Sequence, residues 1–155
     1  MSDAAYYANA GLPFRSIHGT LNHLLLAERL WLERLTGQSG NNGHLALLEH
    51  WRQADLYSTK DSTSIYWEEY VKDRNELGQA LNEECRLYEE WVAKLPDQVS
   101  EEFSYDRKGV LITKPLVETL MHIVNHGTHH RGQISAAVFA AGLPPPVLDM
   151  LYYEN

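Results

Sequence analysis

The first long hydrophobic pattern in the chain runs from about Phe14 to Leu35 and has the spacing of an α-helix. Its apolar positions are Ile17, Leu21, Leu24, Trp31 and Leu35, widened by Leu25, Leu26, Leu30 and Leu32. Only a narrow charged strip around Arg29 and Glu33 interrupts this apolar surface. The pattern therefore predicts a helix over 14–35 that is buried on more than one side.

Two further helices show the same spacing. The first covers 64–95 and ends before Pro96, with apolar positions at Trp67, Tyr70, Leu77, Leu81, Tyr88, Trp91 and Leu95. The second is predicted to begin with Thr113 as its cap and Pro115 in its first turn. It should end at Gly142, which is followed by three prolines.

The remaining segments carry weaker patterns. Residues 1–13 show little helical signal, and 45–57 fit either a short helix or an irregular connector. Residues 103–112 alternate on either side of a turn that contains glycine, which predicts a small β-hairpin or two extended pieces. Long amphipathic helices without strand–helix alternation indicate an all-α helical bundle. We expect a single domain over 1–155.

Composition and charge narrow the class of protein. The chain has 155 residues, 44% of them hydrophobic, and a formal net charge of −8. Because no dense lysine or arginine cluster offsets this charge, we expect no nucleic-acid partner. No apolar stretch approaches the roughly 20 residues of a membrane span and no signal peptide opens the chain, so we expect a cytoplasmic protein without membrane association. The lone Cys85, one turn after Leu81, is expected to be a small packing residue.

The last helix carries the strongest chemical signal, because four of the eight histidines lie between His122 and His130. On a helix, His126 and His130 are one turn apart and can chelate one divalent ion. His23 projects from the apolar surface of the first helix and can supply a third nitrogen, although taken alone it would fit a packed core histidine better than a ligand. Three histidines with an open position are typical of catalytic rather than structural metal sites.

Several polar residues are candidates for the surroundings of this site. His122 lies one turn before His126, where the rim of the site is a better interpretation than a fourth ligand. His129 is expected to be a neighbour of the ligands rather than one of them. Residues that could orient the rings through hydrogen bonds are Asn22, Asn125, Glu28 and Gln133. Three histidines without partners at useful spacing are expected on the surface, namely His18, His44 and His50.

Other catalytic motifs are absent from the sequence. It contains no Gly-x-Ser-x-Gly elbow, no phosphate-binding glycine loop and no His-Glu-x-x-His motif. Gly127 stands where a zinc protease would carry its glutamate base, so peptide hydrolysis by that mechanism is not expected. Imidazole ligands suit several metals, of which we expect zinc or nickel first and iron next.

Three blocks of sequence match the pattern of a known family from about residue 14 to the end. They are Ser16–His23 with Trp31–Gly37, Leu120–Gln133 with its run His-Arg-Gly-Gln, and Ala141-Gly-Leu-Pro-Pro-Pro with Asp149. On these blocks the chain resembles the DinB family, part of the DinB/YfiT-like group of metalloenzymes. The resemblance implies a four-helix bundle of the up-down-down-up type, often dimeric, with a divalent metal on three histidines. Matched by position, these are His23, His126 and His130.

The chain departs from the family pattern at its start. Family members usually carry a further long helix before the segment that matches Phe14, where this chain has only about a dozen residues. The first helix is therefore expected to be short or missing. Either 45–57 fills its place or a second subunit covers the apolar face, and we expect a homodimer.

The resemblance also implies an activity. Relatives in the wider superfamily are transferases or isomerases that use bacillithiol, mycothiol or glutathione. A divalent ion lowers the pKa of a bound thiol or water and so supplies a nucleophile near neutral pH. We expect a metal-dependent S-transferase with a low-molecular-weight thiol, or a hydrolase, acting on a small molecule, with a role in the stress response. The alternative is a non-enzymatic dimeric bundle with a structural or incidental metal.

Overall fold

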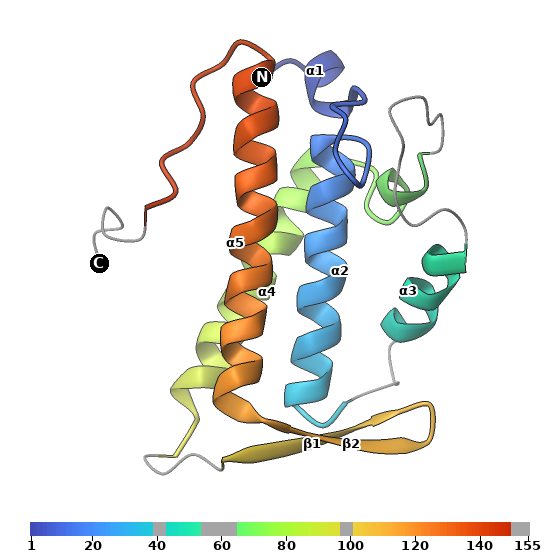
Figure 1. Cartoon of the computed structure of the whole chain (residues 1–155), viewed down its shortest axis with the longest axis vertical. Coiled ribbons are helices and arrows are strands. Elements are labelled where there is room, and N and C mark those ends of the chain that lie inside the picture. The colour runs from blue at the N-terminus through green and yellow to red at the C-terminus, as the bar shows by residue number, and fades with distance from the viewer. Residues whose placement is uncertain (39–42, 54–64, 97–100, 150–155) are drawn as a thin grey trace.

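Three long helices lie side by side and form the body of the molecule (Figure 1). They are α2 (Ile17–Leu35), α4 (Arg74–Ala93) and α5 (Leu116–Ala140). Along the chain, α2 and α4 run in one direction and α5 runs in the opposite one. The computed structural model describes residues 1–38, 43–53, 65–96 and 101–149.

The central element is α2, which contacts most of the others. These are α1 (Asp3–Tyr7), α3 (His44–Gln53), the 3-10 helix Tyr66–Glu68, α4, α5 and the strand β1 (Glu102–Arg107). α2 begins at Ile17, three residues later than predicted, because the Ser16 side chain caps it by accepting a hydrogen bond from Gly19 N–H at 3.0 Å. A side chain at Gly19 would not fit, since its Cβ would lie 2.1 Å from the Phe14 carbonyl oxygen.

Two hydrophobic clusters hold the other elements against α2. The first contains Phe14, Leu26 and Trp67, with half-buried side chains from α3 packed on it, among them Leu47 and Leu48. The second joins α1 to α2 and α5 through Tyr6, Ile17 and Ala137. The first cluster fixes the loop before α2 and the 3-10 helix beside the same stretch of α2.

The expected four-helix bundle is not confirmed. The segment before α2, where a short or missing helix was expected, contains the five-residue α1, capped by Ser2 and tied to α4 by an ion pair between Asp3 and Arg74 at 2.6 Å. The weakly patterned segment 45–57 contains α3, which covers one side of α2. The fold is therefore mostly helical, with three long helices and two short ones in the described residues.

The predicted helix over 64–95 is wrong in its first part. Tyr66–Glu68 form one 3-10 turn, and α4 begins only at Arg74. The Asp73 carboxylate starts this helix by accepting hydrogen bonds from the N–H groups of Asn75 and Glu76, at 2.8 and 2.9 Å. Trp67 and Tyr70 precede α4 at positions that match the spacing of its apolar residues, which explains the wrong prediction. They do not belong to α4, and they pack in the cluster around Phe14 and Leu26.

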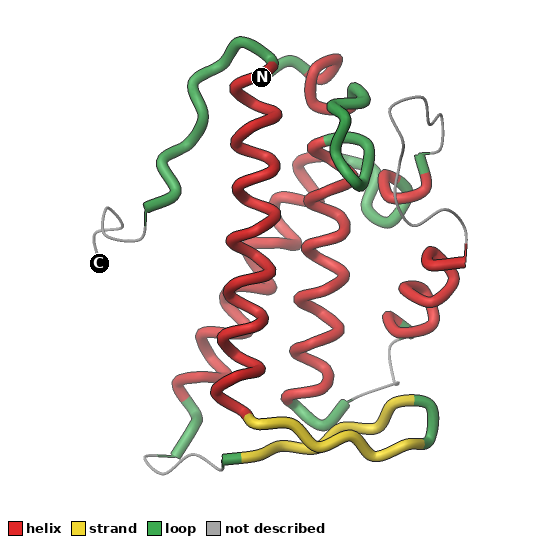
Figure 2. The backbone as a smooth tube through the Cα atoms, in the orientation of Figure 1, coloured by secondary structure: helices red, strands yellow, loops and turns green. Residues whose placement is uncertain are grey.

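A two-stranded antiparallel hairpin confirms the extended pieces predicted over 103–112. β1 pairs with β2 (Val110–Pro115) across one end of the helices, as Figure 2 shows. Thr113 lies in β2 with its hydroxyl 2.8 Å from that of Ser104, so its predicted role as a helix cap is wrong. α5 ends as predicted, because Gly142 adopts a φ of 79°.

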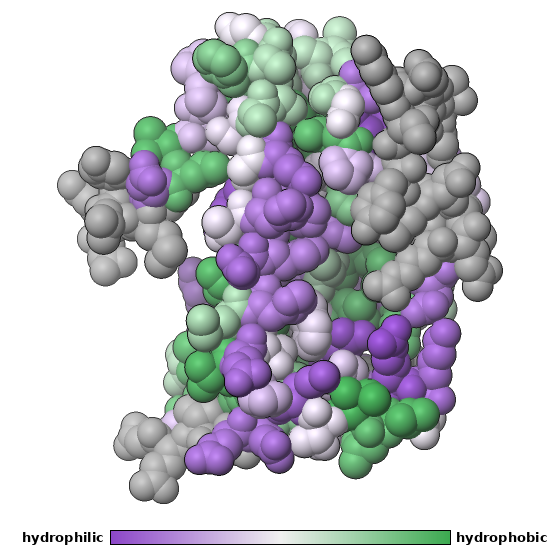
Figure 3. Space-filling model, in the orientation of Figure 1, coloured by the Kyte–Doolittle hydropathy of each residue, from purple (hydrophilic) through white to green (hydrophobic). Residues whose placement is uncertain are grey.

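The surface of the molecule corrects one further prediction. Cys85 is exposed, and the buried position beside it on α4 belongs to Glu84, whose carboxylate accepts a hydrogen bond from Arg29 at 3.3 Å. Hydrophilic side chains crowd the face over α5 and α2, and hydrophobic ones gather on the hairpin (Figure 3), where Leu111 is exposed. None of the helices described is both long and apolar enough to cross a lipid bilayer.

Candidate metal centre

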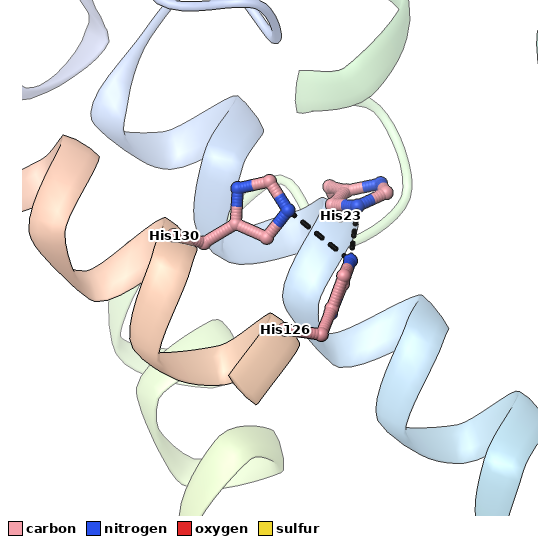
Figure 4. Close-up of side chains that lie close together, drawn as sticks. All are labelled: His23, His126 and His130. Carbon is pink, nitrogen blue, oxygen red and sulfur yellow. Dashed lines mark hydrogen bonds between the residues drawn. The ribbon is translucent and has the colours of Figure 1, made fainter. Parts of the chain in front are cut away.

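Three histidines from two helices meet between α2 and α5 (Figure 4). His23 comes from α2, and His126 and His130 come from successive turns of α5. The Nε2 atom of His126 lies 3.2 Å from that of His23 and 3.1 Å from that of His130. One ring nitrogen of each residue lies within 4.8 Å of those of the other two. The structure thus brings together the trio selected from the sequence.

The spacing of these nitrogens fits a single divalent ion. With metal–nitrogen bonds of about 2.0–2.1 Å and tetrahedral angles, two ligand nitrogens lie about 3.3 Å apart. The two short separations around His126 are close to this value. A neutral imidazole carries only one N–H, so the His126 Nε2 atom can donate to just one of the two nitrogens it faces. An ion at the centre would satisfy the lone pairs of all three rings.

Burial keeps the rings on α5 in the form that binds metals. It lowers the pKa of His126 to about 4, assisted by repulsion from His130, His122 and His129. Burial also lowers the pKa of His130, although its hydrogen bond to Gln133 acts in the opposite direction. Both imidazoles are therefore neutral at pH 7 and have a lone pair to offer.

Aromatic side chains fix the ring of His23. The Phe14 ring stacks on it with centroids 3.9 Å apart and planes 17° from parallel. The Trp67 ring meets it edge-on at 5.0 Å. The apolar pattern offers no reason to choose either residue, because it assigns Phe14 only to the start of one helix and Trp67 to a position in another. The loop before α2 can bring Phe14 to this ring because Gly19 has no side chain, and Trp67 also lies close to Gly19.

One of the expected orienting residues contacts the trio directly. Gln133 Oε1 lies 2.8 Å from His130 Nδ1 and accepts its hydrogen bond, which leaves Nε2 of His130 unprotonated toward His126. The Gln133 Nε2 atom donates to Nε2 of His129 at 3.0 Å. His129 is exposed and therefore lies beside the trio rather than within it.

Three other candidates lie elsewhere. Asn22 is fully buried, and its amide is occupied by the backbone N–H and C=O of Val71, at 3.0 and 3.1 Å. Asn125 is exposed on another side of α5. The Glu28 carboxylate faces Gly127, 3.8 Å from where a Cβ would stand there. None of the three orients a ring of the trio.

His122 is exposed at the rim. Its ring centroid lies 6.2 Å from that of His126 and 5.5 Å from that of Trp31. It does not belong to the close group of ring nitrogens found in the described residues. A fourth protein ligand from this position would require its side chain to move, so the arrangement leaves a coordination position open toward the rim.

The predicted surface position of His18 is wrong. His18 is fully buried, with Nδ1 3.1 Å from the Tyr6 hydroxyl and Nε2 2.8 Å from the Val71 carbonyl oxygen. His44 is half-buried, and its Nδ1 lies 2.5 Å from a carboxylate oxygen of Glu33. The side chain of His50 lies outside the part of the structure described here.

A cavity of about 520 Å³ opens onto the trio. Its walls come from α2, α3, α5 and β1. The aromatic and apolar part consists of Phe14, Trp31, Tyr105, Pro13, Ala27, Leu30, Leu45 and Leu48. The polar part consists of Arg34, Arg107, His23, His122, His126, His129, His130 and Gln133. A small molecule in this cavity can therefore reach the nitrogens of the trio.

The geometry agrees with the comparison to known proteins. The sequence model of the DinB family matches residues 1–155. The chain belongs to the DinB family. A curated relative, protein DinB from Bacillus subtilis (strain 168), is 30% identical over 149 residues, which are 96% of this chain and 77% of the relative. No solved structure matches the chain significantly. Membership in the DinB family confirms the resemblance recognised from the sequence blocks.

Proposed function

We propose that this member of the DinB family is a metal-dependent enzyme in which His23, His126 and His130 hold one divalent ion. The observation that carries the proposal is the convergence of three ring nitrogens at the wall of a cavity. Imidazole donors suit zinc and nickel best, with iron as a further candidate. Three protein ligands leave a position for a substrate atom, as in catalytic zinc sites.

The ion would supply a nucleophile near neutral pH by lowering the pKa of a thiol or water bound to it. The residues of the chain have other tasks. Phe14 and Gln133 hold the rings of His23 and His130 in place. The apolar cavity wall excludes water from one side of a bound molecule, which strengthens electrostatic interactions there. The reaction we favour is S-transfer with a low-molecular-weight thiol, and hydrolysis is the second candidate.

A structural or incidental metal is the competing function. It would favour a closed site with a fourth protein ligand, for which His122 is the nearest candidate. The exposed position of His122 at the rim favours the open, catalytic site instead. The homodimer, the cytoplasmic location and the role in the stress response remain predictions from the sequence.

Replacing His126 tests the metal site. His126→Ala removes the ligand that faces both others, so stoichiometric metal should be lost, while the helical circular dichroism persists because the site lies at a cavity wall. The matched control is His122→Ala, which removes a rim histidine from the same face of α5 and should keep the metal. Elemental analysis of both purified proteins provides the measurement. Full metal content in the His126→Ala protein would refute the site.

A further inference from the structure

The charge of the cavity is opposite to that of the chain. The chain carries a net charge of −8. Among the described residues that line the cavity, none is an aspartate or a glutamate, and two are arginines, Arg34 and Arg107. Two arginines on a cavity wall whose described residues include no carboxylate create a positive potential that attracts anions.

Arg34 is held in place by two aromatic rings. Its guanidinium carbon lies 4.5 Å from the centroid of Trp31 and 4.6 Å from that of Tyr105, and the residue is only 9% exposed. Both rings also line the cavity. A guanidinium fixed in this way loses little conformational freedom when it binds a carboxylate, and its planar fork suits two parallel hydrogen bonds.

Arg107 adds positive charge from the hairpin. Its guanidinium lies 3.5 Å from one oxygen of Glu49, and Lys108 Nζ lies 3.4 Å from the other. One carboxylate thus faces two cations, and the three groups together carry a net charge of +1. Of the two cations, only Arg107 lines the cavity.

The arginines and the histidine trio lie at different ends of the cavity. On α2, Arg34 follows His23 by eleven residues, which correspond to about 16 Å along a helix axis. Ala27, Leu30 and Trp31 line the cavity between them. A ligand that contacts both ends is therefore elongated, with an apolar middle part.

We propose that the cavity binds an elongated organic anion, with a metal-coordinating group at the histidine end and a carboxylate at Arg34 and Arg107. The inference rests on the proposed function, because the first end requires the ion. It defines the substrate or thiol class as acidic. Uncharged molecules of the same length should bind more weakly, since they offer no carboxylate to the two guanidinium groups.

The test uses 8-mercaptooctanoate and its methyl ester as probes, which share a thiol and a chain but differ in charge. Binding to the full, zinc-loaded protein is measured by isothermal titration calorimetry at pH 7.5. The acid should bind at least about 10-fold more tightly than the ester, as expected for hydrogen bonds between ionised groups. Arg34→Met and Arg107→Met should each reduce this preference, mainly by weakening binding of the acid.

Lys108→Met is the matched control, because Lys108 also faces Glu49 but does not line the cavity. It should keep the preference for the acid. Should Arg34→Met fail to fold, Arg107→Met on the exposed strand provides the test. Equal affinities of acid and ester for the unmodified protein would overturn the inference. The metal content of the same samples separates this result from a failure of the metal site itself.

Discussion

At the scale of single residues, Gln133 bonds two histidines of α5 at once. Its carbonyl oxygen accepts from His130 Nδ1, and its amide nitrogen donates to His129. The first bond decides which nitrogen of His130 carries the proton, and therefore which one can bind a metal. Partners of this kind commonly change metal affinity by 10–100-fold when they are removed.

Replacing Gln133 should therefore weaken metal binding without abolishing it. Gln133→Leu removes the acceptor for His130 Nδ1–H, and we expect the affinity for zinc to fall by about 10–100-fold. Gln133→Glu keeps an acceptor at that position. It should bind zinc about 10-fold more tightly than Gln133→Leu does. Competition with a chromophoric chelator measures both. Unchanged affinity in Gln133→Leu would show that the hydrogen bond does not hold the ring.

The residues of the site were predictable only where local spacing determines them. His126 and His130 share a face because they are four residues apart on one helix. Asn22 was misplaced because its partner, Val71, is 49 residues away in a segment without regular structure. His18 was misplaced for the same reason, since Tyr6 and Val71 bury it. Contacts between distant segments leave no periodic signal.

At the scale of elements, a half-buried carboxyl group, that of Glu28, lies where α2 meets α4 and α5. Burial raises the pKa of Glu28 to about 7, and repulsion from Glu84 acts in the same direction. A hydrogen bond from Tyr88 and the charge of Arg131 oppose the shift only in part. Near pH 7, ionisation of Glu28 therefore places a poorly solvated charge between the helices.

The stability of the protein should reflect this carboxyl group. Between pH 4.5 and pH 7 the folded state holds the Glu28 proton while the unfolded state loses it, so this contribution to stability is fully present below about pH 4.5 and falls as pH rises to 7. The loss is about 3 kcal/mol. Glu28→Gln should remove it and be more stable than the unmodified protein at pH 8.

Urea denaturation at pH 5 and pH 8 measures the difference between the two proteins. Glu83→Gln is the control, because Glu83 lies exposed on α4 and its hydrogen bond with Arg86 lowers the pKa of its carboxyl. That group titrates below the range tested, so the control should keep the pH dependence of the unmodified protein. An equal loss of stability in Glu28→Gln between the two pH values would assign the effect to another group.

The boundaries of the elements were less predictable than their existence. The three long helices follow from the periodic spacing of their apolar residues. The start of α4, however, is set by the Asp73 carboxylate that caps it, and the apolar pattern does not mark this position. The start of α5 was predicted at Thr113, but Thr113 and Pro115 are equally suited to an edge strand. Pairing with β1 places both residues in β2 instead. Tertiary contacts thus set the ends that local sequence leaves open.

At the scale of the whole molecule, the proposed ion would link two helices that are distant in sequence. His23 lies on α2, the helix that contacts most other elements, and its partners lie on α5, over 100 residues later. The family resemblance alone implies four long helices, whereas the short segment before Phe14 predicts a short first helix, and α1 has only five residues. In a body of three long helices, an ion that links α2 to α5 should therefore add to the stability of the whole domain.

Metal binding should raise the unfolding temperature of the whole domain. An ion that binds only the folded state at 1,000 times its dissociation constant adds about 4 kcal/mol of stability. For a domain of this size, that corresponds to roughly 8–16 °C. Differential scanning calorimetry of the metal-free protein with and without zinc measures the shift. His122→Ala should show the same shift and His126→Ala almost none, because only the second loses a ligand. A full shift in His126→Ala would mean that zinc stabilises the fold from another place.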